Sequence, residues 1–291
     1  MIGPPPPAYP SGPPPPPPKT RPMNMAHAVL WVTGITLLFL SLGQLAVTLR
    51  ASAQRDLFVG FVCQIASYSG GLFLLLRFYG PDASIREFLA LRRTHAGFYL
   101  FGLLLGLGLV LPTNVLFEAT HRLFPQLTRP SDIADLFAQA STRGRILMGF
   151  AMVVGGPIIE EVLFRGALFG PLLRSHRAAL VILGTGLMFA LVHFDVHALL
   201  PILLVGAALG YLRVVGGSLL PAVLMHAAFN AVPLLTMIVA GHPTEPAEPA
   251  PLPLVPAALS AVACVGLLLA IRQLGHRSSL ARKARSHDPA V

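Results

Sequence analysis

The sequence predicts an all-α polytopic membrane protein with about eight transmembrane helices and a polar cavity inside the membrane. Hydrophobic residues make up 54% of the chain and charged residues 11%, whereas a soluble domain carries about 25% charged residues. Apolar runs recur along most of the chain, each near the length of about 20 residues that a helix needs to cross the hydrocarbon core. Charged side chains interrupt these runs at few places, and those places are candidates for the cavity.

The two ends of the chain lack such runs. Residues 1–25 are dominated by proline, which favours an extended chain and cannot build a core, so we expect a disordered tail. Residues 26–275 form the predicted transmembrane domain, and residues 276–291 a basic C-terminal tail. No secretory signal peptide is evident, because the start is proline-rich rather than a basic segment followed by an apolar one.

Eight runs are long enough to cross a bilayer as helices. They lie at 28–49, 57–76, 96–118, 146–172, 178–195, 198–214, 218–240 and 254–271. Residues 82–93 have the mixed pattern of a short amphipathic helix at the membrane interface, and so do residues 129–141, where a helix can start near Asp132. Gly-x-x-x-Gly patterns within 101–106 and 206–210 predict close packing of helices inside the bundle.

The charged residues indicate an orientation. With eight spans and the N-terminus inside, 14 of the 21 Lys and Arg residues lie inside and six outside. The positive-inside rule then favours both termini in the cytoplasm. The Gly-rich composition of low charge suggests a bacterial inner membrane. The formal charge of +9 gathers at the ends of the runs, which fits anionic lipid of the bilayer and not nucleic acid. Cys63 and Cys264 lie in separate apolar runs, which argues against a disulfide framework and predicts two buried thiols.

Two adjacent glutamates, Glu160 and Glu161, stand inside the fourth run, in GGPIIEEVLFRGALFG. A carboxylate at bilayer depth costs a few kcal/mol, so it normally faces a polar cavity or a partner. Glu161 and Arg165 are four residues apart and share a helix face, so a structural ion pair is the alternative interpretation of Glu161. Glu160 points about 100° away, which allows the two acids different roles. Pro157 predicts a bend that opens room beside Glu160.

Further polar side chains interrupt the fifth and seventh runs. His193 closes the segment Phe189–His193, and His226 and Asn230 project from one helix face. A single histidine in an apolar run is usually a core residue, but polar residues on three separate runs predict a shared site on facing helices. His197 has the spacing of a second metal ligand after His193. We expect it in the turn before the sixth run and do not assign it to the site.

Together these clusters resemble the CPBP family, the CAAX-protease and bacteriocin-processing intramembrane proteases (also called the ABI family), which includes the type II CAAX prenyl endopeptidases. Glu-Glu-x-x-x-Arg, Phe-x-x-x-His and His-x-x-x-Asn follow in this order within residues 145–240, the predicted catalytic core. The resemblance implies an eight-span helical fold that hydrolyses a peptide bond with activated water. It implies catalytic roles for Glu160, Glu161, Arg165, His193, His226 and Asn230.

In this interpretation Glu160, helped by His193, takes a proton from water. His226 and Asn230 donate hydrogen bonds to the oxyanion, while Arg165 fixes Glu161, which holds the helix or relays protons. A second version has Zn²⁺ bound by Glu160, His193 and His226 with an open position for water. The sequence leaves both versions open, so the cofactor is either none or Zn.

The expected substrate is a membrane-associated peptide or protein. Two other functions use the same residue types: a proton-coupled transporter, and a non-catalytic scaffold or immunity protein of the same fold. One geometric problem remains. At 1.5 Å per residue, Glu160 lies about 21 Å from Arg174 but His226 only about 12 Å from Ser218. These depths disagree if the helix ends share one plane.

Overall fold

The computed structural model describes residues 19–50, 56–127, 136–137, 139–240 and 251–286. Every element in these ranges is helical, as the sequence predicts. The long continuous helices are α1 (Met25–Leu49), α2 (Leu57–Tyr79), α4 (Ala96–Leu123), α10 (Leu199–Gly216), α11 (Leu220–Ala240) and α12 (Leu254–Ser286). The fourth predicted run is a composite helix: α6 (Thr142–Phe150), the π-helical turn η2 (Ala151–Gly155), α7 (Gly156–Glu161), the π-helical turn η3 (Val162–Ala167) and α8 (Phe169–Leu173).

Seven helices among the described residues are long and apolar enough to cross a membrane, which confirms the all-α polytopic fold. The fifth predicted run is instead the shorter helix α9 (Ala178–Leu191). Its 14 residues reach only about 21 Å. The chain then turns, with Phe194 at φ 52°, and Asp195 accepts hydrogen bonds from the backbone of His197 and Ala198 to start α10.

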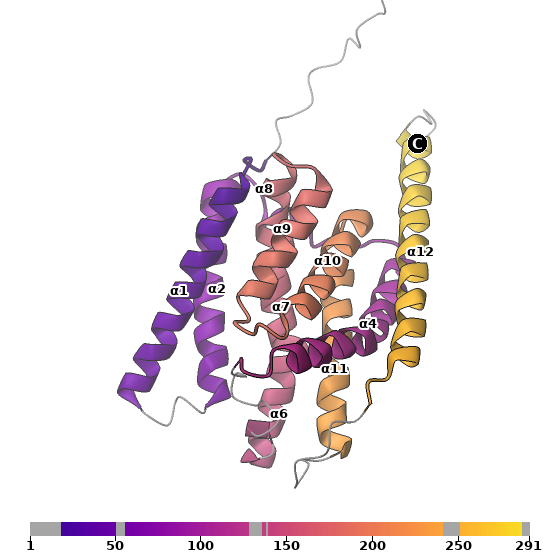
Figure 1. The fold of residues 1–291 in the computed structure, drawn as a ribbon. Helices are drawn as coiled ribbons and strands as arrows, with labels where there is room; N and C mark the ends of the chain where they lie inside the picture. Colours follow the sequence, from indigo (N-terminus) through magenta and orange to yellow (C-terminus); the bar gives the residue numbers. More distant parts are fainter. Residues whose placement is uncertain (1–18, 51–55, 128–135, 138, 241–250, 287–291) are drawn as a thin grey trace, which may run out of the picture.

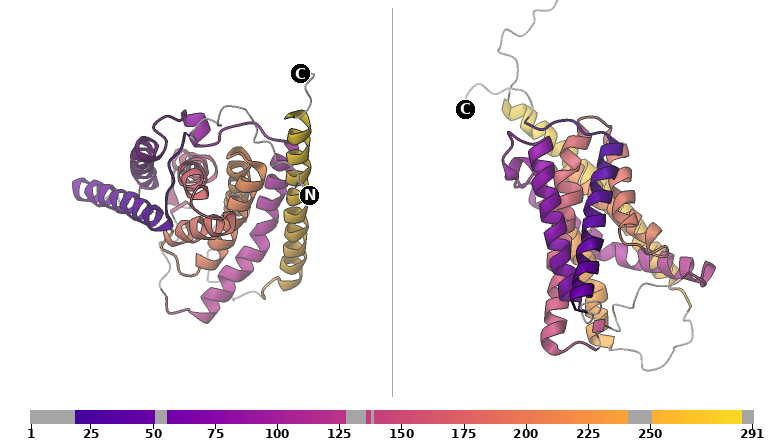
Figure 2. Two further views of the ribbon diagram at one scale, coloured as in Figure 1. Left: turned by 90° about the horizontal axis from the view of Figure 1, so that it is seen from above. Right: turned by 90° about the vertical axis from the view of Figure 1, so that its left-hand side faces the viewer.

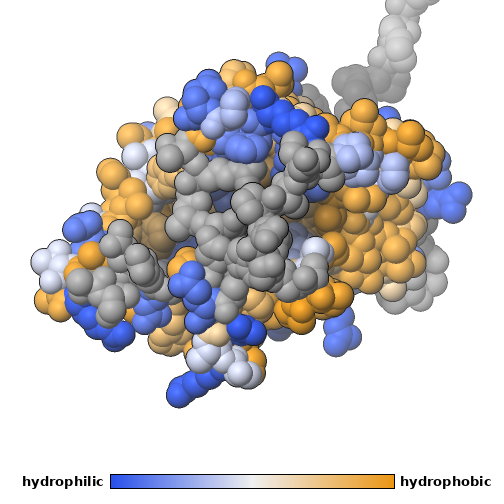
Figure 3. Space-filling model, turned by 60° about the horizontal axis from the view of Figure 1, so that its bottom comes forward, coloured by the Kyte–Doolittle hydropathy of each residue, from blue (hydrophilic) through white to orange (hydrophobic). Residues whose placement is uncertain are grey.

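The helices form one bundle with α1 and α2 at one edge and α12 at the opposite edge (Figure 2). The start of α1 and the end of α12 lie at the same end of the molecule (Figure 1). Exposed apolar side chains cover the flanks of the helices, among them Leu30, Phe73, Leu183 and Val262. When the end opposite to the termini is brought forward, hydrophilic residues gather there beside broad hydrophobic surface (Figure 3). This distribution fits an integral membrane protein.

Two hydrophobic clusters hold the bundle together. One surrounds η3 and α8 and includes Phe164, Phe169 and Phe189, and the other lies where α4, α10, α11 and α12 meet. The glycine patterns permit this closeness, because a Cβ on Gly102 would lie 2.9 Å from the carbonyl oxygen of Pro221, and one on Gly206 would lie 3.0 Å from Cα of Gly186. The predicted packing inside the bundle is therefore confirmed. Both cysteines are free and buried, as predicted.

The ends of the helices do not share one plane. Ser218 and Leu219, which precede α11, are 0% exposed. The backbone of Leu219 donates to the carbonyl of Ala90, and the hydroxyl of Ser218 donates to the carbonyl of Arg92. The start of α11 thus lies inside the fold beneath residues 89–92. This burial removes the disagreement in depth between Glu160 and His226.

The predicted segments outside the spans differ from the structure in detail. Within 82–93 only α3 (Ile85–Phe88) is helical, because the chain after it turns inward to bury Leu89, so the predicted interfacial helix is wrong for most of its length. Residues 129–141 lie largely outside the described residues, as do residues 1–18 of the proline-rich tail. Met23 is buried and its backbone binds the carbonyl of Pro171. At the other end α12 continues through Ser286 into the predicted basic tail.

Candidate active site

The two glutamates lie in α7, a helix of six residues between the two π-helical turns. Pro157 occupies the first turn of α7, directly after η2, and it has no N–H to donate within the helix. π-helical turns lie on both sides of α7, and such turns are frequent at functional sites. Gly156 and Pro157 line a cavity that also contains Glu160.

Glu161 is held behind this cavity. Its Oε1 atom lies 2.7 Å from Nη1 of Arg165, and both side chains are 0% exposed. The other end of the guanidinium donates to the carbonyl oxygen of Gly206 at 2.9 Å, and its Cζ atom lies 4.5 Å from the ring centre of Phe189. The predicted contact between Glu161 and Arg165 is thus confirmed. Neither residue lines the cavity.

His226 connects the two glutamates. Its Nδ1 atom lies 3.0 Å from Oε1 of Glu161. Because a carboxylate that pairs with an arginine only accepts hydrogen bonds, Nδ1 of His226 carries the proton in this contact. The other ring nitrogen, Nε2, lies 3.8 Å from Oε2 of Glu160. Glu161 therefore orients the ring of His226, and the Nε2 atom of His226 faces the cavity.

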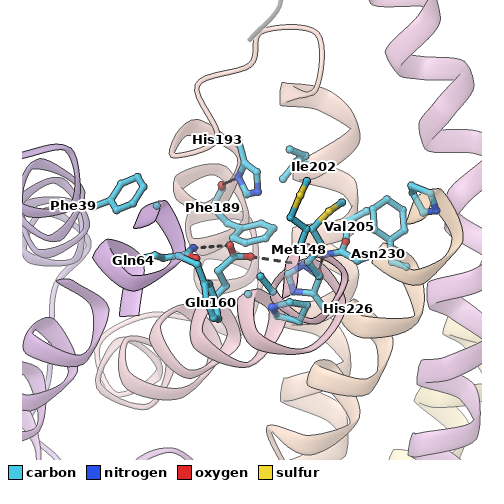
Figure 4. A pocket seen from close by; sticks show the side chains of 18 residues that line it. Phe39, Gln64, Met148, Glu160, Phe189, His193, Ile202, Val205, His226 and Asn230 are labelled. Carbon is cyan, nitrogen blue, oxygen red and sulfur yellow. Dashed lines mark hydrogen bonds and ion pairs between the residues drawn. The ribbon is translucent and has the colours of Figure 1, made fainter. Parts of the chain in front are cut away.

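Glu160 has a different environment from Glu161. Its side chain is 17% exposed and lines the cavity. Its Oε1 atom accepts a hydrogen bond of 3.0 Å from Nε2 of Gln64 on α2, and its Oε2 atom faces His226 (Figure 4). Two neighbouring carboxylates thus differ in their partners and exposure, as the 100° separation on a helix predicts.

His193 and Asn230 complete the polar lining of the cavity. Nδ1 of His193 lies 2.7 Å from the carbonyl oxygen of Phe189, so this nitrogen donates and Nε2 is the one left to accept a hydrogen bond. Nδ2 of Asn230 donates to the carbonyl oxygen of Met152 at 2.9 Å, which leaves one further N–H of the amide. His193 lines the cavity with Glu160 but forms no hydrogen bond to it among the described residues.

The cavity has a volume of about 500 Å³. Its apolar lining comes from several helices and includes Phe39, Phe61, Met148, Met152, Ile202, Val205 and Phe229. A second cavity of about 650 Å³ shares Phe61, Met148 and Ala151 with the first. It extends past Asp56 and Arg143 to the end of the molecule where α2 and α6 begin. The two cavities are therefore neighbours, and the shared side chains lie between the site of Glu160 and this end of the molecule.

Sequence reasoning missed the contribution of the first two helices. Phe39 of α1 and both Phe61 and Gln64 of α2 line the cavity beside Glu160, although these helices lie outside the three motifs. A signal was present, because Gln64 is an amide inside an apolar run, in LFVGFVCQIASYSG. His197 belongs elsewhere. It is 1% exposed and its Nε2 atom lies 3.1 Å from the carbonyl of Phe124.

The donor set for zinc does not fit this arrangement. Within the described ranges, no three His, Cys, Asp or Glu side chains lie close enough together to hold one metal ion. Nε2 of His226 and Oε2 of Glu160 face each other, but His193 does not join them as a third ligand. We therefore derive no step through a metal.

The sequence was compared with known protein families, curated proteins and solved structures. Residues 142–232 match the family model described as type II CAAX prenyl endopeptidase Rce1-like. No curated protein and no solved structure matches the chain. The matched segment runs from α6 into α11 and contains Glu160, Glu161, Arg165 and the three further motif residues. Residues 142–232 are therefore similar to the type II CAAX prenyl endopeptidases, which supports the resemblance that the three motifs predict.

Proposed function

We propose that the protein is an intramembrane endopeptidase that hydrolyses a peptide bond of a membrane-associated peptide or protein with glutamate-activated water. The observation that carries this proposal is the pair formed by Oε2 of Glu160 and Nε2 of His226, 3.8 Å apart in a cavity enclosed by apolar helices. An acid and an imidazole that face one cavity can supply the base for a reacting water and a hydrogen-bond donor for the oxyanion.

Glu160 is the general base in this proposal. Its carboxylate takes a proton from water while the water oxygen bonds to the carbonyl carbon of the substrate. The same proton then passes to the peptide nitrogen as the carbon–nitrogen bond breaks, so atoms and charge balance. Burial among apolar side chains strengthens these electrostatic interactions relative to water. His193 accepts a hydrogen bond from the water through Nε2 and so orients it.

His226 and Asn230 stabilise the oxyanion of the tetrahedral intermediate. For this role His226 acts in its imidazolium form, which has an N–H on each ring nitrogen. An imidazolium keeps one N–H on Glu161 and has the other, on Nε2, for the oxyanion. The second N–H of Asn230 is the other donor. Each such donor contributes roughly 3–4 kcal/mol to the transition state.

The apolar lining of the cavity supports a substrate that lies in the membrane. The lining is mostly apolar, which suits hydrophobic side chains next to the scissile bond. We also propose that both termini are cytoplasmic, because Lys and Arg gather at the end that holds both termini. The Gly-rich composition of low charge supports the proposal that the membrane is a bacterial inner membrane. The turn between α9 and α10, residues 192–198, contains no Lys or Arg, so the short length of α9 leaves this count unchanged.

A comparison of peptides tests the proposal. Membranes with the wild-type chain and with Glu160→Gln are compared for new peptide termini by mass spectrometry. We expect termini that appear with the wild type and fall roughly 10²- to 10⁴-fold with Glu160→Gln. Asp82→Asn, a matched change at an exposed acid outside the cavity, should behave as wild type. Identical termini for wild type and Glu160→Gln would reject peptide hydrolysis at this site. Proton-coupled uptake into vesicles that depends on Glu160 would then favour a transporter.

A further inference from the structure

We propose that Gln64 is a positioning residue that orients the carboxylate of Glu160 for proton transfer. This inference rests on the proposed function and extends it to a helix outside the matched segment. Nε2 of Gln64 lies 3.0 Å from Oε1 of Glu160, and both side chains line the same cavity (Figure 4). The hydrogen bond joins α2 to α7 across 96 positions of the chain.

The hydrogen bond from Gln64 gives the two carboxylate oxygens of Glu160 different partners. Oε1 accepts the amide N–H of Gln64, whereas Oε2 faces Nε2 of His226. An ionised carboxylate only accepts hydrogen bonds, which identifies the amide nitrogen as the atom of Gln64 that faces it. One oxygen is thereby held and the other is left for the proton of water. A general base must lie within hydrogen-bond reach of that proton, so its orientation enters directly into the rate.

The position of Gln64 is itself fixed by packing. One turn earlier on α2, the ring of Phe61 lies against Gly155, so close that any side chain at Gly155 would overlap it. One turn later, Tyr68 is buried and lines a smaller cavity together with Gln64, Glu160 and His193. The contact of Phe61 with Gly155, directly before α7, and the burial of Tyr68 thus hold α2 beside the composite helix. This packing is what brings the amide to Glu160.

The chemistry of an amide suits this role. Gln64 donates without carrying a charge, so it holds an ionised carboxylate without neutralising it, unlike the arginine that pairs with Glu161. A hydrogen bond to a charged group contributes about 1.5–3 kcal/mol. If the orientation of Glu160 depends on this bond, its loss lowers kcat by about 10- to 100-fold. KM changes little, because Gln64 acts through Glu160 and not on the substrate.

The test compares Gln64→Leu with Gln44→Leu in the full-length chain in lipid vesicles. Gln44 is exposed on α1 and away from the cavity, so it is a matched control. The probe is a quenched-fluorescence peptide that spans a cleavage site mapped by the termini that depend on Glu160. We expect a 10- to 100-fold loss of kcat with a KM within about twofold for Gln64→Leu, and wild-type kinetics for Gln44→Leu.

A spectroscopic measurement separates positioning from general damage to the fold. The infrared carboxylate band of Glu160 is obtained as the difference between wild type and Glu160→Gln. The frequency of this band should shift in Gln64→Leu and stay unchanged in Gln44→Leu. Gln64→Glu sets two carboxylates against each other, so its activity should be lowest at neutral pH and recover in part as the pH falls, because one of the two takes up a proton.

The outcomes distinguish this inference from the proposed function. If Gln64→Leu has wild-type kcat and an unshifted infrared band of Glu160, Gln64 does not position Glu160. The loss of peptide termini in Glu160→Gln would still support the protease function in that case. If the peptide termini are the same in wild type and Glu160→Gln, the proposed protease function is rejected, whatever the infrared measurement shows. If Gln64→Leu does not fold, the pH profile of Gln64→Glu decides: a profile parallel to that of wild type overturns the role.

Discussion

Nδ1 of His226 and Nη1 of Arg165 bind the same oxygen of Glu161, at 3.0 and 2.7 Å. Glu161 therefore orients the histidine of the cavity while the arginine holds Glu161 from the other side. Arg165 is anchored in turn by the carbonyl of Gly206. The chain Gly206–Arg165–Glu161–His226 links α10, η3, α7 and α11, and it fixes His226 before any substrate arrives.

We expect Glu161→Gln to destabilise the protein and to lower its activity. Removing one partner of a buried ion pair leaves an uncompensated charge, which costs about 3–5 kcal/mol, and His226 loses the acceptor that orients it. Thermal unfolding in detergent checks the stability, and kcat of the folded fraction checks the activity. The double variant Glu161→Gln, Arg165→Met should recover part of the stability, since no charge remains unpaired, but none of the activity.

A surface ion pair is the control for that experiment. Lys19 and Glu87 are 2.8 Å apart, but their side chains are 57% and 51% exposed. Such pairs are screened by solvent and stabilise little. Lys19→Met should therefore leave the unfolding temperature and the activity near those of wild type. An effect of Glu161→Gln no larger than that of Lys19→Met would contradict the role of the buried pair.

The sequence predicts the site better than it predicts its surroundings, for a physical reason. Charges inside apolar runs are costly, so Glu160, Glu161 and Arg165 stand out in a single chain, and the spacing of four residues identifies the ion pair. Gln64 is neutral and costs less to bury, so its signal is weaker. Which neutral residue approaches Glu160 depends on how α2 packs against α7, and the close contact of Phe61 with Gly155 is not visible in the sequence.

The lengths of the helices show a second limit. Residues 178–195 are mostly apolar and predict a full span, but α9 ends at Leu191, and Asp195 accepts hydrogen bonds from the backbone of His197 and Ala198 in the turn before the next helix. Likewise, apolar composition cannot show that Ser218 and Leu219 lie inside the fold beneath residues 89–92. Hydropathy measures transfer from water and does not distinguish lipid from protein as the apolar surroundings.

Asn230→Asp should lower kcat by roughly 10²- to 10³-fold with little change in KM. An ionised carboxylate cannot donate to the oxyanion or to the carbonyl of Met152, which Asn230 binds at 2.9 Å. Steady-state kinetics with the mapped peptide measure this change. Asn24, which caps α1 outside the cavity, offers the control Asn24→Asp, and we expect wild-type kinetics from it. A large rise in KM with kcat unchanged would indicate that Asn230 binds the substrate rather than the oxyanion.

Two histidines four residues apart should give opposite results. His193 lines the cavity, so His193→Ala should lower kcat by at least about tenfold and leave the unfolding temperature nearly unchanged. His197 is buried against Phe124 and His121, so His197→Ala should lower the unfolding temperature while the folded fraction keeps its kcat. Unfolding curves and kinetics on both variants check this. Loss of kcat in stable His197→Ala protein would place His197 in the catalytic machinery.

Removal of metal ions should leave the activity intact. The described side chains bring no three His, Cys, Asp or Glu donors together, and in the proposed mechanism Glu160 moves the proton without a metal. Purified protein is analysed for metals and assayed before and after treatment with a chelator, and zinc is then added back. We expect less than one zinc per chain and full activity throughout. One zinc per chain, lost together with activity and restored with it, would instead require His193 to move toward Glu160 and His226 as a third ligand, and Glu160 would then hold the metal rather than act as the base.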